Sequence, residues 1–134
     1  MPKYFLIKRI TAGLIDYTIW FGLFWSSLSL FGEKTVVRTY EFDYGWIFFI
    51  GLWIIVMIIP ETLFQSTIGN LLLKLKVVNE NGGKIKFSQS LLRHCADMID
   101  MWPLGLVGIL TIKYSKKHQR LGDMIGKTIV IERN

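Results

Sequence analysis

The segment ITAGLIDYTIWFGLFWSSLSLF, residues 10–31, is long enough to cross a lipid bilayer and holds one ionisable residue, Asp16. As a helix rising about 1.5 Å per residue, it would be about 33 Å long, against a hydrocarbon core of about 30 Å. A carboxylate at that depth is costly unless it is paired, neutralised or hydrated, which makes Asp16 a candidate functional residue. Arg9 lies two helical turns earlier and projects from nearly the same face as Asp16.

A second apolar segment, YGWIFFIGLWIIVMIIPETLF at residues 44–64, carries no charge before Glu61 and is also long enough to span. Pro60 can kink or end this helix, because it lacks an amide hydrogen and its ring clashes with the preceding turn. Glu61 is expected at the cytoplasmic mouth of the span, either as an ordinary helix-end charge or as part of a polar site. The length of the first segment, with Asp16 inside it, argues against a cleaved signal peptide.

The composition favours a membrane protein without catalytic or metal chemistry. Of the 134 residues, 51% are hydrophobic, and the net charge of +6 is concentrated at the ends of the apolar segments. That placement fits anionic lipid better than nucleic acid. The single cysteine, Cys95, excludes an intramolecular disulfide and a cysteine metal cluster. His94 and His118 have no partners at ligand spacing, and no phosphate-binding loop or catalytic motif is present. We therefore expect no enzyme activity, no metal and no cofactor.

The second half of the chain begins with a β pattern. Residues 73–77 (LKLKV) and 84–87 (KIKF) alternate apolar and basic side chains on either side of the turn-forming sequence NENGG. This pattern predicts a small cytoplasmic β-hairpin at about residues 73–87. Its apolar face would consist of Leu75, Val77, Ile85 and Phe87. Residues 127–132 (KTIVIE) are also β-prone and could add a third strand on the same side of the membrane.

A third helical segment is predicted at about residues 88–112. Ser88 is a plausible N-cap for a helix to Trp102, which Pro103 then interrupts. One polar stripe on this helix comprises Arg93, Asp97 and Asp100, which form either a polar site or the wet face of an interfacial helix. After Pro103, only nine apolar residues precede Lys113, a rise of about 14 Å that covers roughly half a bilayer core.

Charge counting predicts the topology. The N-terminus, the 65–88 loop and residues 113–133 are all basic, so the positive-inside rule places them in the cytoplasm and only the 32–43 loop outside. Residues 88–112 should then lie along the interface or re-enter without crossing; the alternative is a third, Pro-kinked span over residues 91–112. The expected fold is an all-α membrane protein with two transmembrane helices, this re-entrant or interfacial kinked helix, the hairpin and a C-terminal motif at 113–134. Both termini would lie on the cytoplasmic side of the plasma (bacterial inner) membrane.

Four stretches of the chain resemble the RDD family, membrane proteins named for one arginine and two aspartates. Residues 8–16 (KRITAGLID) resemble its opening, 67–78 (TIGNLLLKLKVV) and 91–93 (LLR) its middle, and 118–130 (HQRLGDMIGKTIV) its closing motif. The family arginine and aspartates would be Arg9, Asp16 and Asp123, whereas Asn70 replaces a usual basic residue. The resemblance covers the whole chain as a single domain, 1–134. It implies an integral membrane protein with a suggested transport role, and sodium/proton exchange is claimed for some members.

The residues and the resemblance together predict a polar cluster open toward the cytoplasm. Asp123 could meet Arg9 there, or it could simply pair with Arg120 or cap a short helix. The expected members of the cluster are Arg9, Asp16, Glu61, Arg93, Asp97, Asp100 and Asp123.

Two functions fit such a cluster. In the first, a monovalent cation or proton binds and leaves Asp16, while Arg9 tunes the pKa of Asp16 or serves as its counter-ion. Two spans do not easily enclose a pathway, so this function needs a homo-oligomer or a membrane partner. In the second, the cluster only locks helix packing in a non-transporting accessory or assembly module, and the cytoplasmic hairpin docks a partner.

Overall fold

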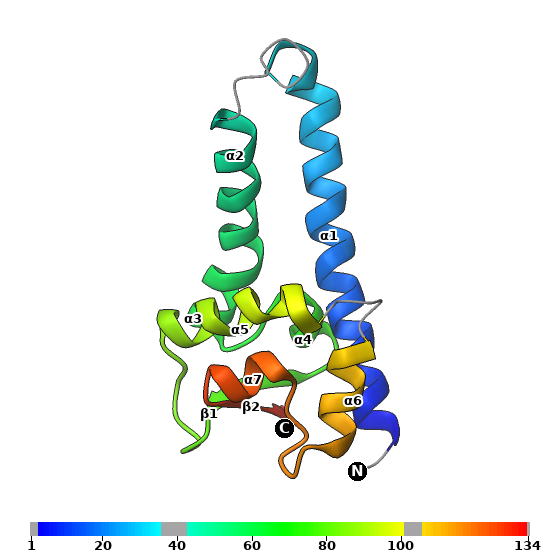
Figure 1. The fold of residues 1–134 in the computed structure, drawn as a ribbon, viewed down its shortest axis with the longest axis vertical. Helices are drawn as coiled ribbons and strands as arrows, with labels where there is room; N and C mark the ends of the chain where they lie inside the picture. The colour runs from blue at the N-terminus through cyan, green and yellow to red at the C-terminus, as the bar shows by residue number, and fades with distance from the viewer. Residues whose placement is uncertain (1–2, 36–42, 101–105, 134) are drawn as a thin grey trace.

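Two upright helices standing on a smaller base make up the molecule, as seen in a computed structural model that describes residues 3–35, 43–100 and 106–133. The uprights are α1 (Lys3–Thr35) and α2 (Asp43–Trp53), which lie side by side (Figure 1). The base contains the remaining helices and a two-stranded antiparallel sheet. The two uprights form a helical hairpin, called the α1–α2 hairpin below. Both ends of the chain lie in the base, away from the top of this hairpin (Figure 1).

The second upright confirms the predicted apolar helix. Helix α2 continues through a π-helical turn, η1 (Ile54–Ile58), into α3 (Ile59–Phe64). Within the described residues, Ile47–Phe64 is the one helix long and apolar enough to cross a membrane by length and composition. Pro60 does not stop this helix. It directly follows the π-helical turn, in the first turn of α3, where the regular hydrogen-bond pattern has already changed. The helix ends at Gln65, whose φ of 56° is left-handed.

The first predicted span lies inside α1, which is 33 residues long. Several of its large apolar side chains are exposed, among them Leu14, Phe21, Leu23 and Trp25. The uprights meet through aromatic packing, in which the rings of Trp20 and Phe49 lie edge to face with centroids 4.5 Å apart. Around Trp20, a buried cluster of Val56, Met57 and Ile58 joins α1 to η1.

The base is built from short elements around one longer helix. These elements are α4 (Ile68–Leu72), β1 (Leu75–Asn79), α5 (Phe87–Asp100), α6 (Leu106–Tyr114), α7 (Leu121–Ile125) and β2 (Thr128–Glu132). Helix α5 lies across the foot of the hairpin, with α7 below it and α6 beside the lower part of α1 (Figure 1). The helix predicted after Ser88 is present as α5. The predicted N-cap is wrong, however, because α5 already begins at Phe87 and Ser88 lies inside it. Pro103 lies outside the described residues.

The predicted β-hairpin at residues 73–87 is wrong in its pairing. Strand β1 pairs with β2, with Val77 opposite Val130, and residues 84–87 form no strand because α5 begins at Phe87. The intervening turn is closed instead by the side chain of Asn79, whose oxygen accepts the backbone N–H groups of Asn81 and Gly83. Ile85 is nevertheless buried in one cluster with Leu75, Val77, Val130 and Ala12, whereas Phe87 is half exposed.

Two glycines set how closely the base packs. A Cβ atom on Gly69 of α4 would overlap the carbonyl oxygen of Ala12, so α4 can cross α1 only without a side chain at that position. A Cβ atom on Gly122 of α7 would lie 2.5 Å from the carbonyl oxygen of Arg93 in α5. These close approaches bring the polar side chains of α1, α5 and α7 together.

Candidate functional site

Charged side chains are buried at the foot of the hairpin, where α1, α3, α5 and α7 meet. Removing such groups from water costs several kcal/mol each unless hydrogen bonds and opposite charges replace the lost hydration. The structure supplies both, as the following contacts show. Among the residues that the structure describes, six ionisable side chains are less than a tenth exposed: Arg9, Asp16, Glu61, Arg93, His94 and Asp123.

A chain of ion pairs links four helices. Arg93 of α5 donates to Glu61 of α3 at 2.6 Å and contacts the Oδ1 atom of Asp123 in α7 at 3.0 Å. The other oxygen of Asp123 accepts from Arg9 of α1 at 2.5 Å. Glu61, predicted as either a helix-end charge or a site residue, is therefore fully buried within the site.

Asp123 has both of the roles that the sequence left open. Besides its ion pair with Arg9, its Oδ2 atom accepts the backbone N–H of Arg120 at 2.9 Å and so caps α7. Burial alone would raise the pKa of the Asp123 carboxyl, but the guanidinium groups of Arg9, Arg93 and Arg120 hold it well below its usual range. Asp123 is therefore ionised at neutral pH. Arg120 in turn donates to the backbone carbonyl of Arg9 at 2.9 Å.

His94 belongs to the site, although the sequence analysis set it aside. Its Nδ1 atom lies 2.8 Å from Asp97, and its Nε2 atom lies 3.2 Å from Glu61. Burial lowers the pKa of His94, but the carboxylates of Glu61 and Asp97 outweigh that effect and raise it to about 10. The ring is therefore an imidazolium ion at neutral pH. One signal was available in the sequence, since His94 and Asp97 are three positions apart on a helix and so share a face.

Asp97 also receives a contact from the first helix. The hydroxyl of Tyr17 donates to its Oδ2 atom at 2.9 Å. Burial opposes ionisation of Asp97, but His94, Arg120 and this hydroxyl favour the carboxylate and lower the pKa of Asp97. The predicted stripe thus places Arg93 and Asp97 in the site, whereas the side chain of Asp100 lies outside the described residues.

Asp16 is held by neutral donors. Its two oxygens accept from the hydroxyl of Thr67 and from the backbone N–H of Gly69, both at 2.6 Å. Arg9, the predicted counter-ion of Asp16, pairs with Asp123 instead. Thr67 has a second role as the N-cap of α4, where its hydroxyl oxygen accepts the N–H of Asn70. Thr67, Tyr17 and Arg120 could not be predicted as site residues from the sequence, because their partners lie on other elements.

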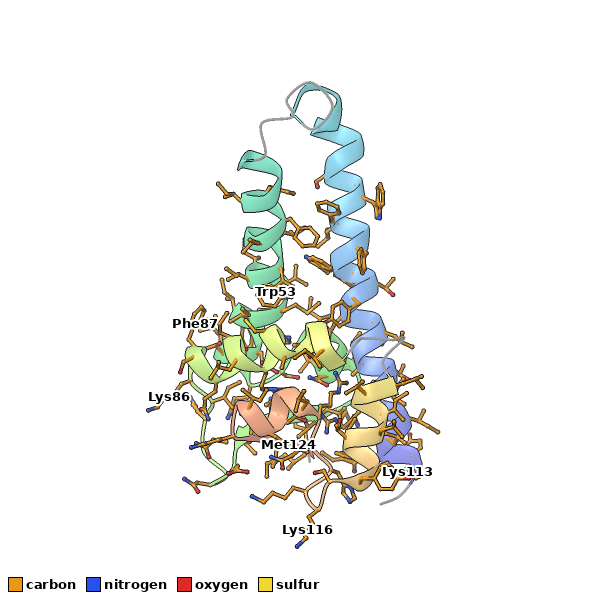
Figure 2. All side chains as sticks on the ribbon, in the orientation of Figure 1. Trp53, Lys86, Phe87, Lys113, Lys116 and Met124 are labelled. Atoms are coloured by element: carbon orange, nitrogen blue, oxygen red, sulfur yellow. The ribbon has the colours of Figure 1, made fainter. Side chains whose placement is uncertain are left out.

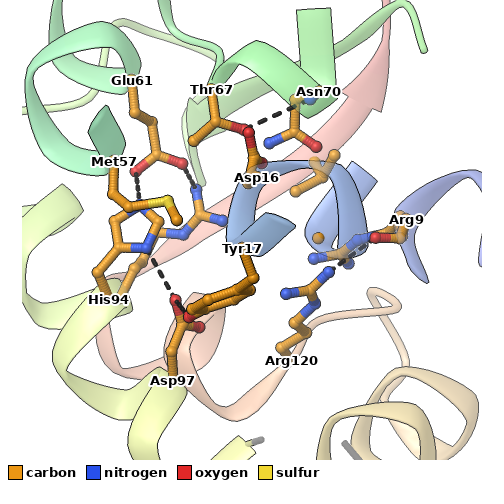
Figure 3. Close-up of a pocket in the computed structure, with 13 residues that line it drawn as sticks. Arg9, Asp16, Tyr17, Met57, Glu61, Thr67, Asn70, His94, Asp97 and Arg120 are labelled. Carbon is orange, nitrogen blue, oxygen red and sulfur yellow. Dashed lines mark hydrogen bonds and ion pairs between the residues drawn. The ribbon is translucent and has the colours of Figure 1, made fainter. Parts of the chain in front are cut away.

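A cavity of about 30 Å³ lies among these side chains (Figure 3). That volume is large enough for a water molecule or a small ion. Its walls include Asp16 and Tyr17 from α1, Glu61 from α3, and His94 and Asp97 from α5. Among the residues that the structure describes, no group of three or more His, Cys, Asp or Glu side chains is arranged to hold a metal ion.

The formal charges around the cavity balance only when His94 is protonated. The four carboxylates, Asp16, Glu61, Asp97 and Asp123, face three guanidinium groups, Arg9, Arg93 and Arg120. The protonated His94 ring supplies the fourth positive charge. With all four carboxylates ionised, the cluster is neutral as a whole, and gaining or losing one proton or one monovalent cation changes its net charge.

Comparison with known proteins identifies one family. The sequence model of the RDD family matches residues 5–127, nearly the whole chain. No curated protein and no solved structure matches this chain.

Proposed function

Because this chain belongs to the RDD family over nearly its whole length, we propose that it is an integral membrane protein whose α1–α2 hairpin crosses the bilayer. The apolar helix Ile47–Phe64 and the exposed apolar side chains of α1 support this placement. The base, which contains both termini and most of the basic residues, then lies on the cytoplasmic side of the plasma membrane. Helix α5 stays on that side, without a third crossing.

The function that we propose for the polar site is the uptake and release of a proton or a small monovalent cation. The observation that carries this proposal is the cavity of about 30 Å³, bounded by the carboxylates of Asp16, Glu61 and Asp97 at the foot of the hairpin. The two donors to Asp16, the Thr67 hydroxyl and the Gly69 backbone N–H, carry no charge. A positive charge beside Asp16 would therefore meet a carboxylate that is not already in a close ion pair.

Transport through such a site requires more than one chain. Two membrane helices do not enclose a pathway, and the exposed apolar surface of both uprights offers room for neighbours. We therefore propose a homo-oligomer or a complex with another membrane protein as the transporting unit.

The substitution Asp16→Asn tests this function. Asparagine keeps the shape of the side chain, and the Thr67 hydroxyl can turn to accept from the new amide group, so the fold should survive. In proteoliposomes with imposed Na⁺, K⁺ or H⁺ gradients, the wild-type protein should show ion flux. The flux through the variant should be lower by about tenfold or more. Thermal stability and oligomeric state should stay unchanged. Glu80→Gln, an exposed acid in the base, serves as the control and should keep full flux.

A second function has an observation of its own in its favour. The ion-pair chain from Glu61 through Arg93 and Asp123 to Arg9 satisfies those charges internally and fastens the hairpin to the base. In a non-transporting accessory or assembly module, the ion-pair chain would serve only to hold the α1–α2 hairpin to the base, and the β1–β2 sheet would bind a partner. Absence of flux in the wild-type protein, together with collapse of the Asp16→Asn fold, would favour this function over transport.

A further inference from the structure

Helix α5 is polar on its inner face and apolar on its outer face. Its Ser90, Arg93 and His94 side chains are buried, with at most 7% exposed. Leu92 and Ile99, by contrast, are 48% and 55% exposed, and Cys95 between them is exposed as well. An amphipathic helix surrounded by water has the opposite arrangement, with its apolar stripe toward the protein.

The exposed residues of α5 form a continuous stripe. Leu92, Cys95 and Ile99 recur at spacings of three and four, so they lie on one helix face. Helix α5 packs against α3, where the membrane helix ends with Leu63 and Phe64, both about two-thirds exposed. Exposed apolar side chains therefore lie on both of these packed helices. A group of exposed apolar side chains of this kind marks a site of membrane or protein contact.

Positive charge adjoins this stripe where the chain enters α5. Lys84 and Lys86 are exposed, and among the described residues neither has an acidic side chain within ion-pair distance. Figure 2 shows Phe87 pointing toward the hairpin and Lys86 pointing away from it. A lysine on one side, followed at once by an apolar side chain on the membrane side, matches the boundary between phosphate headgroups and acyl chains.

We propose that α5 lies flat in the cytoplasmic leaflet, with its outer stripe against lipid acyl chains and with Lys84 and Lys86 bound to anionic phospholipid headgroups. Lipid is the expected occupant of the stripe, because α5 packs against the end of the spanning helix and the adjoining Lys84 and Lys86 complement anionic headgroups. This inference rests on the proposed membrane placement, but not on ion handling, so a protein without ion flux would leave it intact.

The single cysteine makes the test direct. A bimane fluorophore on Cys95 of the full chain, reconstituted in phosphatidylglycerol/phosphatidylcholine vesicles, reports what lies beside the stripe. Quenching by doxyl-labelled lipid with little quenching by aqueous iodide is the expected result. Bimane on Lys116→Cys in a Cys95→Ser background is the matched control, and it should show the reverse, since Lys116 lies at the far end of the base (Figure 2). Strong iodide quenching at Cys95 would overturn the proposal, and so would protection from both quenchers, which indicates a protein neighbour.

The headgroup part of the proposal has its own comparison. Doxyl-phosphatidylglycerol should quench bimane on Cys95 more than doxyl-phosphatidylcholine does. In the double variant Lys84→Gln with Lys86→Gln, the ratio of quenching by these two lipids should fall close to one. Removing two lysines elsewhere in the base, Lys116→Gln with Lys117→Gln, controls for total charge and should leave the ratio unchanged. An unaltered ratio in the Lys84/Lys86 variant would refute binding of anionic headgroups there.

Discussion

Arg93 is the residue on which the ion-pair chain most depends. It contacts two carboxylates, those of Glu61 and Asp123, that are almost without solvent contact. In Arg93→Gln, both acids would remain buried with less compensation, and breaking a buried ion pair typically costs about 3–5 kcal/mol. We expect that loss in the free energy of unfolding, measured by denaturant titration in detergent micelles. Lys117→Gln removes an exposed ion pair with Glu80 and should change stability little.

Because of His94, the stability of the folded protein should fall as the pH becomes alkaline. Its pKa rises from an ordinary value of 6.5 to about 10 on folding, because Glu61 and Asp97 outweigh its burial. A raised pKa stabilises the folded state fully below about pH 6.5, and that contribution disappears as the pH rises toward 10. The melting temperature should therefore fall between pH 7 and 10, by about 5 °C or more.

The His94→Gln variant identifies the source of this pH dependence. It should have a lower melting temperature than wild type at pH 7 and a flatter profile up to pH 10. Wild-type and variant profiles that run parallel would show that His94 is not the titrating group.

Residues could be predicted at the site when their chemistry, their spacing or the family motif singled them out. Asp16 stood out because a carboxylate in an apolar segment is costly, Arg9 because it lies two helical turns from Asp16, and Asp123 through the family resemblance. His94 did not, because its importance comes from Glu61, which reaches it from a different helix. Neither the helical period nor ligand spacing records a contact of that kind.

At the scale of elements, the crossing of α4 over α1 depends on Gly69. An added Cβ would overlap the Ala12 carbonyl oxygen and press on Asp16, whose carboxyl carbon would lie 3.0 Å away. The Ala12 backbone on one side and the hydrogen-bonded Asp16 carboxylate on the other leave little room to adjust. Gly69→Ala should therefore lower the free energy of unfolding by about 1–3 kcal/mol. Gly22→Ala, on α1 with nothing within 4 Å, should be neutral or stabilising, because alanine favours helix. Equal melting temperatures for the two variants would contradict the close crossing.

Helices were more predictable than strand pairing. Apolar length located the helix Ile47–Phe64, and the pattern of residues after Ser88 located α5, although Ser88 lies inside that helix and does not cap it. Alternation also identified β1 and the β-prone C-terminal run, but alternation specifies faces and not partners. The turn after Asn79 resembles a hairpin in composition, yet side-chain hydrogen bonds close it without a second strand. The β2 strand could pair only once α7 had returned the chain to β1, which local sequence does not encode.

At the scale of the whole molecule, the sheet constrains the path through the membrane. Strand β1 follows the hairpin, β2 ends the chain, and they are paired over Leu75–Asn79 and Thr128–Glu132. In the proposed membrane placement, the chain between them must therefore begin and end on one side of the bilayer. A third, Pro-kinked span over residues 91–112 would separate the two strands, so we retain the prediction of an interfacial segment. Charge counting likewise predicts that both ends of the chain share one side of the membrane, and both ends lie in the base (Figure 1).

Cysteine labelling in intact cells tests this topology. In a Cys95→Ser background, Lys34→Cys at the top of the hairpin should react with a membrane-impermeant maleimide added outside, whereas Lys84→Cys and Lys116→Cys should react only after permeabilisation. The reason is that the base holds both the sheet and the basic residues, which the positive-inside rule keeps in the cytoplasm. External labelling of Lys116→Cys together with protection of Lys84→Cys would mean a third crossing and would break the β1–β2 pairing. External labelling of both, with Lys34→Cys protected, would keep the fold and invert the protein in the membrane.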